Sequence, residues 1–140
     1  MNKFQGIRPI ALGLAIHNNK VLAHEGFDTV KQETFYRVLG GGIEFLETSE
    51  QALVREFKEE INADIKVLEK LDVVENIFVF DGQGAHEIVF LYRIEIPAEQ
   101  IQEQYTIVDN GVESVAKWVD QHDITIGGRI IYPEAVRKYL

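Results

Sequence analysis

Residues 54–62, VREFKEEIN, place three glutamates near the end of a predicted helix, and no other stretch constrains the chain as much. The helix is predicted over residues 48–61, because Thr48 and Gln51 match a capping box at its start. Apolar residues then recur every four positions, at Leu53, Phe57 and Ile61. This spacing gives the helix one apolar stripe, which we expect to pack on a sheet.

The charged side of this helix is unfavourable as a helix end. Glu56, Glu59 and Glu60 stand in an i, i+3, i+4 relation, so they share one face and repel by roughly 0.2–0.5 kcal/mol per pair. They also lie where the helix dipole disfavours negative charge, by roughly 0.3–1 kcal/mol each. A solvated acidic face is the ordinary explanation of a glutamate-rich helix end. Two penalties in one place favour instead a site for a hard cation, which prefers oxygen ligands.

A glycine triplet, residues 40–42, precedes the helix at a fixed distance. Glycine lets backbone groups approach a ligand closely, although a triplet alone is also typical of ordinary turns. From Gly41 the chain reads GGIEFLETSEQALVREFKEEINA, and this stretch closely resembles the Nudix box, G-x5-E-x7-R-E-U-x-E-E-x-G-U, where U is a bulky aliphatic residue. The matching positions are Gly41, Glu47, Arg55, Glu56, Glu59 and Glu60.

The chain departs from the box at three positions. Phe57 is an aromatic residue at a bulky aliphatic position, Asn62 stands in place of glycine, and Ala63 is smaller than the family's residue. The family's glycine ends the helix in a left-handed conformation, which asparagine adopts more readily than most residues. We therefore expect the helix to end at Asn62, at some cost in stability.

The resemblance implies an α/β protein, namely a Nudix-type α/β/α sandwich with a mixed β-sheet, in a single domain over residues 1–140. It implies hydrolysis of a nucleoside diphosphate linked to another moiety, with Mg²⁺ as cofactor and Mn²⁺ as a substitute. It further implies that Glu56, Glu59 and Glu60 are metal ligands, joined by the backbone carbonyl of Gly40. Divalent ions suit this reaction because they neutralise phosphate oxygens and lower the pKa of bound water.

Two further box residues receive roles from the same resemblance. Arg55 would orient the glutamates, and Glu47 would pair with Arg55 or with the metal shell. For Glu47, an ordinary charge near a helix start is an equal alternative, because acidic residues are favourable there. One box glutamate, Glu59 or Glu56, would also accept the proton of the attacking water, or a glutamate from a later loop would do so. Glu113, in the loop at residues 109–114, is the first candidate from outside the box, and Glu87 is the second.

The rest of the chain reads mostly as strands. Two hairpins are predicted, one from residues 8–16 and 20–25 around the turn at 17–19, and one from residues 67–80 and 86–96 around the turn at 81–84. Further short strands are predicted at residues 34–39 and 115–119, and a closing helix at residues 133–140, since Pro133 suits a first helical position.

Substrate-binding residues are open on the sequence alone. Arg8, Arg37 and Arg93 are candidates for phosphate contacts, because guanidinium groups bind phosphate oxygens in pairs. Phe78 and Phe80 share one face of a predicted strand and can stack on a base, although core packing is the more ordinary role. Glu87 and the neighbouring His86 are candidates to line the site, against the alternative that both are structural.

The composition narrows the classes of partner. With 140 residues and a formal net charge of -9, the chain lacks the positive surface that nucleic-acid binding requires. Residues 10–16 are too short an apolar run for a membrane span, and the absence of cysteine fits a cytoplasmic protein. A small-molecule nucleotide is the expected partner. Family members are often homodimers, and the sequence leaves this open here.

Three functional hypotheses follow. The first is an active hydrolase that cleaves a nucleoside diphosphate sugar such as ADP-ribose, or removes pyrophosphate from a (d)NTP. The second is a catalytically silent Nudix-fold nucleotide-binding or sensor module, which would be expected to lack one or more box glutamates. The third is a non-enzymatic acidic protein that buffers cations. This hypothesis does not explain Arg55 or the fixed spacing between the glycine triplet and the helix.

Overall fold

We analysed a computed structural model, in which residues 6–109 and 111–140 are described. The strands are β1 (Ile7–His17), β2 (Lys20–Asp28), β3 (Glu33–Gly42), β4 (Lys66–Phe80), β5 (Gln83–Glu95), β6 (Gln104–Asp109), β7 (Val112–Asp120) and β8 (Ile131–Tyr132). The helices are α1 (Ser49–Ile61), α2 (Gln121–Thr125) and two 3₁₀ helices, η1 (Ala98–Gln100) and η2 (Glu134–Tyr139).

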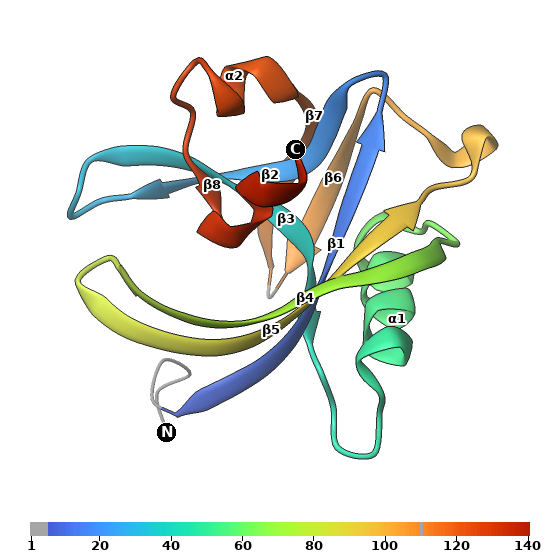
Figure 1. The fold of residues 1–140 in the computed structure, drawn as a ribbon, viewed down its shortest axis with the longest axis horizontal. Coiled ribbons are helices and arrows are strands. Elements are labelled where there is room, and N and C mark those ends of the chain that lie inside the picture. Colours follow the sequence, from blue (N-terminus) through green and yellow to red (C-terminus); the bar gives the residue numbers. More distant parts are fainter. Residues whose placement is uncertain (1–5, 110) are drawn as a thin grey trace.

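The described strands form one mixed sheet of eight strands (Figure 1). Their order is β4-β5-β1-β3-β2-β7-β6, and β8 pairs with β3 outside this path. The pairs β1–β5 and β3–β8 are parallel, and the other pairs are antiparallel. The predicted mixed sheet is therefore confirmed, with β1 near its middle.

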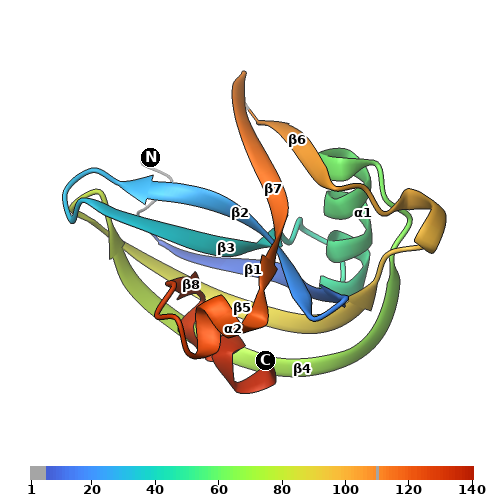
Figure 2. The ribbon, with the colours of Figure 1, turned by 90° about the horizontal axis from the view of Figure 1, so that it is seen from above.

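Helices cover both faces of this sheet. On β1, Ala11 and Ala15 belong to the core cluster that contains Leu53 and Phe57 of α1. The alternate β1 residues Ile10, Leu12 and Leu14 belong to a second cluster, with Ile124 of α2 and Val136 of η2. Because successive side chains of a strand point to opposite faces, this division places the helices on opposite sides, as Figure 2 shows. The predicted α/β/α arrangement is confirmed.

Helix α1 begins and ends where the sequence predicts. The Gln51 N–H donates to Thr48 Oγ1 at 3.1 Å, and the Thr48 N–H donates to Gln51 Oε1 at 2.9 Å, so the capping box is formed. At the other end, Asn62 has φ 53° and ψ 39°, the left-handed conformation that the family's glycine would adopt. The Asn62 N–H donates to the Lys58 carbonyl at 3.1 Å and the Ala63 N–H donates to the Phe57 carbonyl at 3.3 Å, which closes the last turn.

The left-handed residue gives a first prediction. We expect Asn62→Ala to lower the free energy of unfolding by about 1 kcal/mol, because alanine is strained at positive φ. Asn62→Gly should leave it within about 0.5 kcal/mol of the wild type, since glycine adopts this conformation freely but loses more backbone entropy on folding. Urea denaturation of the three proteins measures both effects. Equal stability of the alanine and glycine variants would contradict the proposed role of the cap.

Both predicted hairpins are confirmed, each with a two-residue turn. Residues Asn18 and Asn19 connect β1 to β2 with φ of 49° and 64°. Residues Asp81 and Gly82 connect β4 to β5 with φ of 49° and 77°. Positive φ at both central residues matches the right-handed twist of the flanking strands, and Asn, Asp and Gly tolerate it best.

Two expectations near the C-terminus need correction. The predicted loop at residues 109–114 is largely strand, because β6 and β7 form a hairpin that pairs Val108 with Glu113. Asn110 in this turn lies outside the described residues. The closing helix is a short 3₁₀ helix, with Pro133 before its first residue. No helix in the described part of the chain has the length and apolar character needed to cross a membrane.

Candidate active site

An acidic cavity of about 450 Å³ lies between α1 and the sheet. Glu56, Glu59 and Glu60 of α1 line it, together with Gly40, Gly41 and Gly42 at the end of β3. Asp109 and Ser114 of the β6–β7 hairpin line the other side. The structure therefore brings the glycine triplet and the three helix glutamates to one hollow.

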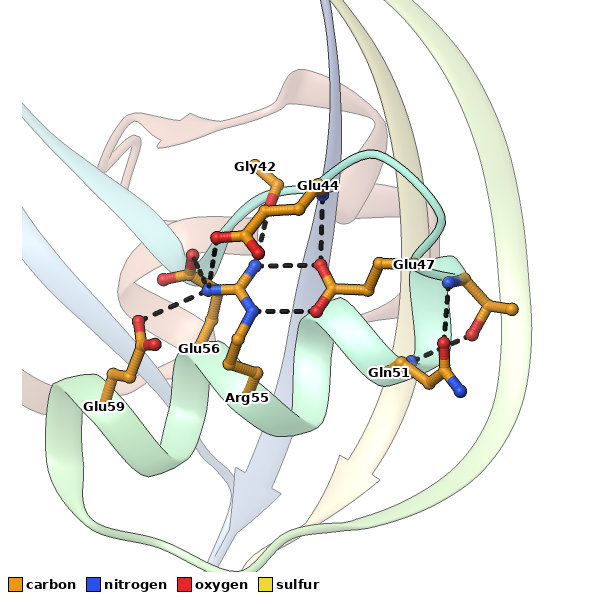
Figure 3. A network of polar contacts seen from close by, with 8 residues as sticks. Gly42, Glu44, Glu47, Gln51, Arg55, Glu56 and Glu59 are labelled. Atoms are coloured by element: carbon orange, nitrogen blue, oxygen red, sulfur yellow. Dashed lines mark hydrogen bonds and ion pairs between the residues drawn. The ribbon is translucent and has the colours of Figure 1, made fainter.

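Arg55 connects four acidic or backbone groups beside this cavity (Figure 3). Its Nε and Nη2 donate to the two carboxylate oxygens of Glu47, at 2.8 and 2.9 Å. Its Nη1 donates to Glu56 Oε1 at 2.9 Å and to Glu59 Oε2 at 3.3 Å, and Nη2 also donates to the Gly42 carbonyl at 3.0 Å. The guanidinium thus fixes the helix glutamates relative to the glycine loop.

Glu47 is bound from two sides. The paired contact with Arg55, followed by the backbone N–H of Glu44, lowers the pKa of the Glu47 carboxyl to about 2. The same contact raises the pKa of Arg55, so the pair stays ionised throughout the neutral range. Glu47 does not line the cavity, and of its two expected partners it contacts the arginine.

Close packing places Glu56 against the glycine loop. A β-carbon added to Gly41 would lie 2.3 Å from the Glu56 Cδ, so a larger residue there would displace the Glu56 carboxylate. A β-carbon on Gly40, which has φ 148°, would lie 2.0 Å from the Ala11 carbonyl oxygen. Gly40 thus allows close approach of β3 to β1, and Gly41 allows close approach of the Glu56 carboxylate to β3.

Negative charge accumulates around Glu60. Burial, followed by the charges of Glu56, Asp109 and Glu59, raises the pKa of the Glu60 carboxyl to about 8. Five carboxylates line this cavity against two arginines, so the lining carries an excess of negative charge that a further cation would balance. This is the charge pattern that a divalent-ion site presents when the ion is absent.

A second, more apolar cavity of about 370 Å³ adjoins the acidic one. Aromatic side chains line it, namely Phe35, Phe78, Phe80 and Tyr132. Four residues line both cavities, and we call them the neck: Arg8, His24, Arg37 and Glu87. A molecule with a charged end and a planar end can therefore lie across both cavities, with the neck around its middle.

The neck contains one tight ion pair. Arg37 Nη2 lies 3.0 Å from both carboxylate oxygens of Glu87, whose exposed fraction is 5%. The Arg37 guanidinium also lies 6.0 Å from the centre of the Phe78 ring. Arg8, by contrast, has no ion-pair partner among the described residues. Burial, and then the charge of Arg37, lowers the pKa of His24, so its imidazole is neutral at pH 7.

The structure therefore gathers most of the residues proposed from the sequence. Arg8, Arg37, Phe78 and Glu87 all line the aromatic cavity, and their roles as substrate contacts stay predictions. Phe80 lies there as well. Three candidates lie elsewhere: Glu113 is exposed on β7, Arg93 pairs with Glu69 at 3.5 Å, and His86 lines neither cavity.

Sequence reasoning missed several lining residues, three of which are polar groups at or beside the acidic cavity. Asp109 and Ser114 line the acidic cavity, and His24 lines both cavities. Asp109 and Ser114 flank Glu113 in the β6–β7 hairpin, and the pleat of β7 explains why Ser114 lines the cavity while Glu113 does not. An acidic residue just before a predicted turn was the available signal for Asp109. For His24, no local signal distinguishes it from an ordinary strand residue.

A family model described as the NUDIX domain matches residues 7–139, which is nearly the whole chain. The chain belongs to the Nudix family. Its glutamate helix, glycine loop and Arg55 are thus the Nudix box in folded form. A comparison with curated protein sequences found no match.

Solved Nudix structures share this fold at low sequence identity. The Nudix hydrolase from Nitrosomonas europaea is 14% identical, covers 95% of this chain and 85% of its own, and has a TM-score of 0.60. An ADP-ribose pyrophosphatase from Streptococcus suis is 11% identical, with coverages of 89% and 79% and a TM-score of 0.58. A MutT Nudix hydrolase from Burkholderia pseudomallei is 16% identical, with coverages of 84% and 85% and a TM-score of 0.58.

The arrangement of the box glutamates bears on the expected metal. Within residues 6–109 and 111–140, no three His, Cys, Asp or Glu side chains are arranged so that they could hold a metal ion as they stand. The reason is visible in Figure 3, where Arg55 holds the carboxylates of Glu56 and Glu59. The donor set nevertheless fits a hard cation, because carboxylate oxygens converge on a cavity with excess negative charge. Glu56 also makes a side-chain hydrogen bond with Glu60, so these two carboxyl groups already adjoin.

The charge around Glu60 predicts an unusual pH dependence. The pKa of Glu60 in the folded protein is about 8, well above the ordinary 4.5 of a glutamate, so folding favours the protonated carboxyl. Its contribution to stability is complete below the unfolded value and is lost as the pH rises through the folded value. In a chelator we therefore expect the melting temperature to fall between about pH 5 and about pH 8. Thermal unfolding across this window measures the slope.

Two controls separate this effect from other titrations. Glu60→Gln should flatten the decline, and Mg²⁺ should reverse it, because a bound cation favours the ionised carboxyl. A melting temperature that stays level or rises with pH in chelator would show that the pKa of Glu60 is not raised in the folded protein.

Proposed function

We propose that the protein is a divalent-metal-dependent hydrolase that cleaves a diphosphate bond in a nucleotide by attack of water at phosphorus. The observation that carries this proposal is the junction of the two cavities. Acidic side chains gather at one end, aromatic side chains gather at the other, and an arginine-containing neck joins them. A nucleotide has the same polarity, with phosphates at one end and a planar base at the other.

Glu56, Glu59 and Glu60 would hold the metal, with the Gly40 carbonyl as a further donor. The ion would supply neutralisation of the phosphate oxygens and a more acidic water molecule. The side chains of the chain itself have separate tasks. Arg55 orients two of the glutamates through the hydrogen bonds described above, and Glu47 keeps Arg55 in place.

Arg8 and Arg37 would bind phosphate oxygens from the neck, since both line the two cavities. Arg8 reaches the glycine loop, because its Nη2 lies 3.7 Å from the position of a β-carbon on Gly42. Phe78 would stack on the base while contacting Arg37. For the proton acceptor, Glu59 and Glu56 remain candidates from the box, and Asp109 replaces Glu113 because it lines the acidic cavity.

Two substrate types fit this arrangement, a nucleoside diphosphate sugar such as ADP-ribose and a (d)NTP. One structural neighbour is named as an ADP-ribose pyrophosphatase, which is an enzyme of the first type. The silent binding module is the weaker alternative, because every glutamate and the arginine of the box are present. We place the activity in the cytoplasm, consistent with a chain without cysteine.

The test is phosphate or pyrophosphate release from a panel of nucleoside triphosphates, sugar nucleotides and dinucleotides, with Mg²⁺, with Mn²⁺ and with chelator. We expect release from at least one class in the presence of either metal and none in chelator. The Glu59→Gln variant serves as the background. If wild type and Glu59→Gln release product at the same rate across the panel, the hydrolase proposal fails, and calorimetric nucleotide binding would then favour the binding module.

A further inference from the structure

The aromatic cavity lies between two hairpins whose tips are fastened together. The β2–β3 hairpin contributes Phe35 and Arg37, and the β4–β5 hairpin contributes Phe78, Phe80 and Glu87. Figures 1 and 2 show the two hairpins running side by side to their turns. The neck lies at one end of the cavity, toward the acidic side chains, and the turns lie at the other.

Three residues fasten the turns, and we call Asp28, Thr29 and Asp81 the latch. The Asp81 N–H donates to Asp28 Oδ2 at 3.1 Å. In return, the Thr29 N–H and Oγ1 donate to Asp81 Oδ1 at 2.8 and 3.0 Å. Each aspartate thus accepts hydrogen bonds from the opposite hairpin, so the latch is reciprocal. The Lys31 ammonium adds one more crossing bond, to the Val79 carbonyl at 2.9 Å.

Asp28 is more buried and makes more hydrogen bonds than is usual for a residue next to a surface turn. Its exposed fraction is 2%, and its second oxygen, Oδ1, accepts from the N–H groups of Val30 and Lys31 at 3.0 and 2.9 Å. A buried carboxylate is stable only when it is fully hydrogen-bonded, and here three backbone donors supply this. Asp28 also lines the aromatic cavity, so the latch forms part of its wall.

The space behind the latch is limited. The cavity volume is about 370 Å³, near the lower end of the roughly 300–1,000 Å³ found for small-molecule sites. Phe35 and Phe80 meet across it, with ring centres 5.7 Å apart and an edge-to-face angle of 84°. A planar group that enters past the neck therefore meets aromatic side chains in mutual contact and the latch, which together limit the space for it.

We infer that the latch limits the size of the planar group that the aromatic cavity accepts, and that it selects nucleotides with a compact, unsubstituted base. This inference rests on the proposed function, because the group enters as part of a nucleotide. Asp28, Thr29 and Asp81 are positioning residues, since they act through the separation of the hairpins. Loosening the latch lets the hairpins move apart, which weakens contacts to a compact base and makes room for a larger one.

Two variants loosen the latch with little change in shape. Asp28→Asn keeps an oxygen for the two donors of its own turn, which leaves the amide NH₂ facing the Asp81 N–H and removes that crossing bond. Thr29→Val removes the hydroxyl that donates to Asp81. The matched control is Thr125→Val, which removes the hydroxyl bond to the Gln121 carbonyl in α2, away from both cavities.

The assay compares ATP and GTP with derivatives that carry a benzyl group on the exocyclic amine of the base. We expect the wild type to prefer the compact nucleotides by at least roughly tenfold in kcat/KM. Each latch variant should raise KM for the compact nucleotides by roughly threefold, with kcat nearly unchanged, and should improve kcat/KM for the benzyl derivatives. Thr125→Val should leave the preference unchanged.

The latch variants are expected to change kcat/KM in opposite directions for compact and benzylated nucleotides. A latch that only stabilised the fold would change both in the same direction. If latch variants lose activity equally on compact and benzylated nucleotides, or change neither, the inference is overturned. Calorimetric binding of methylene-bridged, non-hydrolysable analogues of the same nucleotides separates this failure from failure of the proposed function. A wild type that binds the compact analogue but hydrolyses nothing overturns the hydrolase and still tests the latch. A wild type that binds neither analogue overturns the inference about the latch, while product release from the nucleotide panel decides the hydrolase proposal separately.

Discussion

Replacing Glu56 with glutamine is expected to lower kcat by about three orders of magnitude, because the amide keeps the shape but removes a charge that would hold the metal. Glu56 lies over Gly41, lines the acidic cavity and adjoins Glu60, so it is central to the cluster. The same substitution should raise the melting temperature in chelator, since it removes one of the charges that repel Glu60. A fall in activity together with a gain in metal-free stability separates a functional carboxylate from a structural one.

Steady-state kinetics on the best nucleotide of the panel, and thermal unfolding with and without Mg²⁺, measure these effects. Glu50→Gln is the matched control, because Glu50 is in the first turn of the same helix and lines neither cavity. It should retain activity within about twofold, having lost only a favourable dipole contact. Glu56→Gln within tenfold of the wild type would exclude Glu56 from the proposed metal site.

The second large effect is expected for Arg55→Lys. Lysine retains the positive charge but cannot reproduce the planar fork that binds both oxygens of Glu47 while reaching Glu56 and the Gly42 carbonyl. We expect kcat to fall by about two orders of magnitude, because the glutamates lose their common orientation. The free energy of unfolding should fall by about 2 kcal/mol, the scale of one or two lost charge-assisted hydrogen bonds.

Arg137→Lys is the control for the loss of a guanidinium as such. Arg137 donates to the carbonyls of Ile124 and Arg129 at 2.7 Å each, in a part of the fold that lines neither cavity. This variant should lose stability and keep its kcat. If Arg55→Lys kept wild-type kcat despite lower stability, Arg55 would be a structural residue only.

Local features of the fold were predictable from the sequence. The capping box at Thr48, the left-handed end at Asn62 and the two-residue turns at Asn18–Asn19 and Asp81–Gly82 depend on neighbouring residues alone. The Nudix box was readable for the same reason, since one helix and the loop before it carry all its charged positions. These elements needed no knowledge of which strands pair.

Features that depend on distant pairing were not predictable in the same way. The parallel pairing of β1 with β5 joins residues that are far apart in the sequence, and it determines that Arg8 lies beside Glu87. The β2–β3 pairing likewise places His24 opposite Arg37. Arg8, Arg37 and Glu87 could therefore be proposed individually from the sequence. That they lie together with His24 in the neck could be seen only in the folded sheet. Strand β6 was missed because it is short and its turn resembled an ordinary loop.

The two cavities meet at the neck but otherwise take their side chains from separate parts of the chain. The acidic end belongs mainly to α1, the glycine loop and the β6–β7 hairpin, and the aromatic end belongs mainly to the β2–β3 and β4–β5 hairpins. In evolutionary terms, this division lets the hairpins mutate toward a new preference while the box glutamates stay the same. Proteins with this architecture can therefore change their substrate preference in evolution while their catalytic residues stay unchanged.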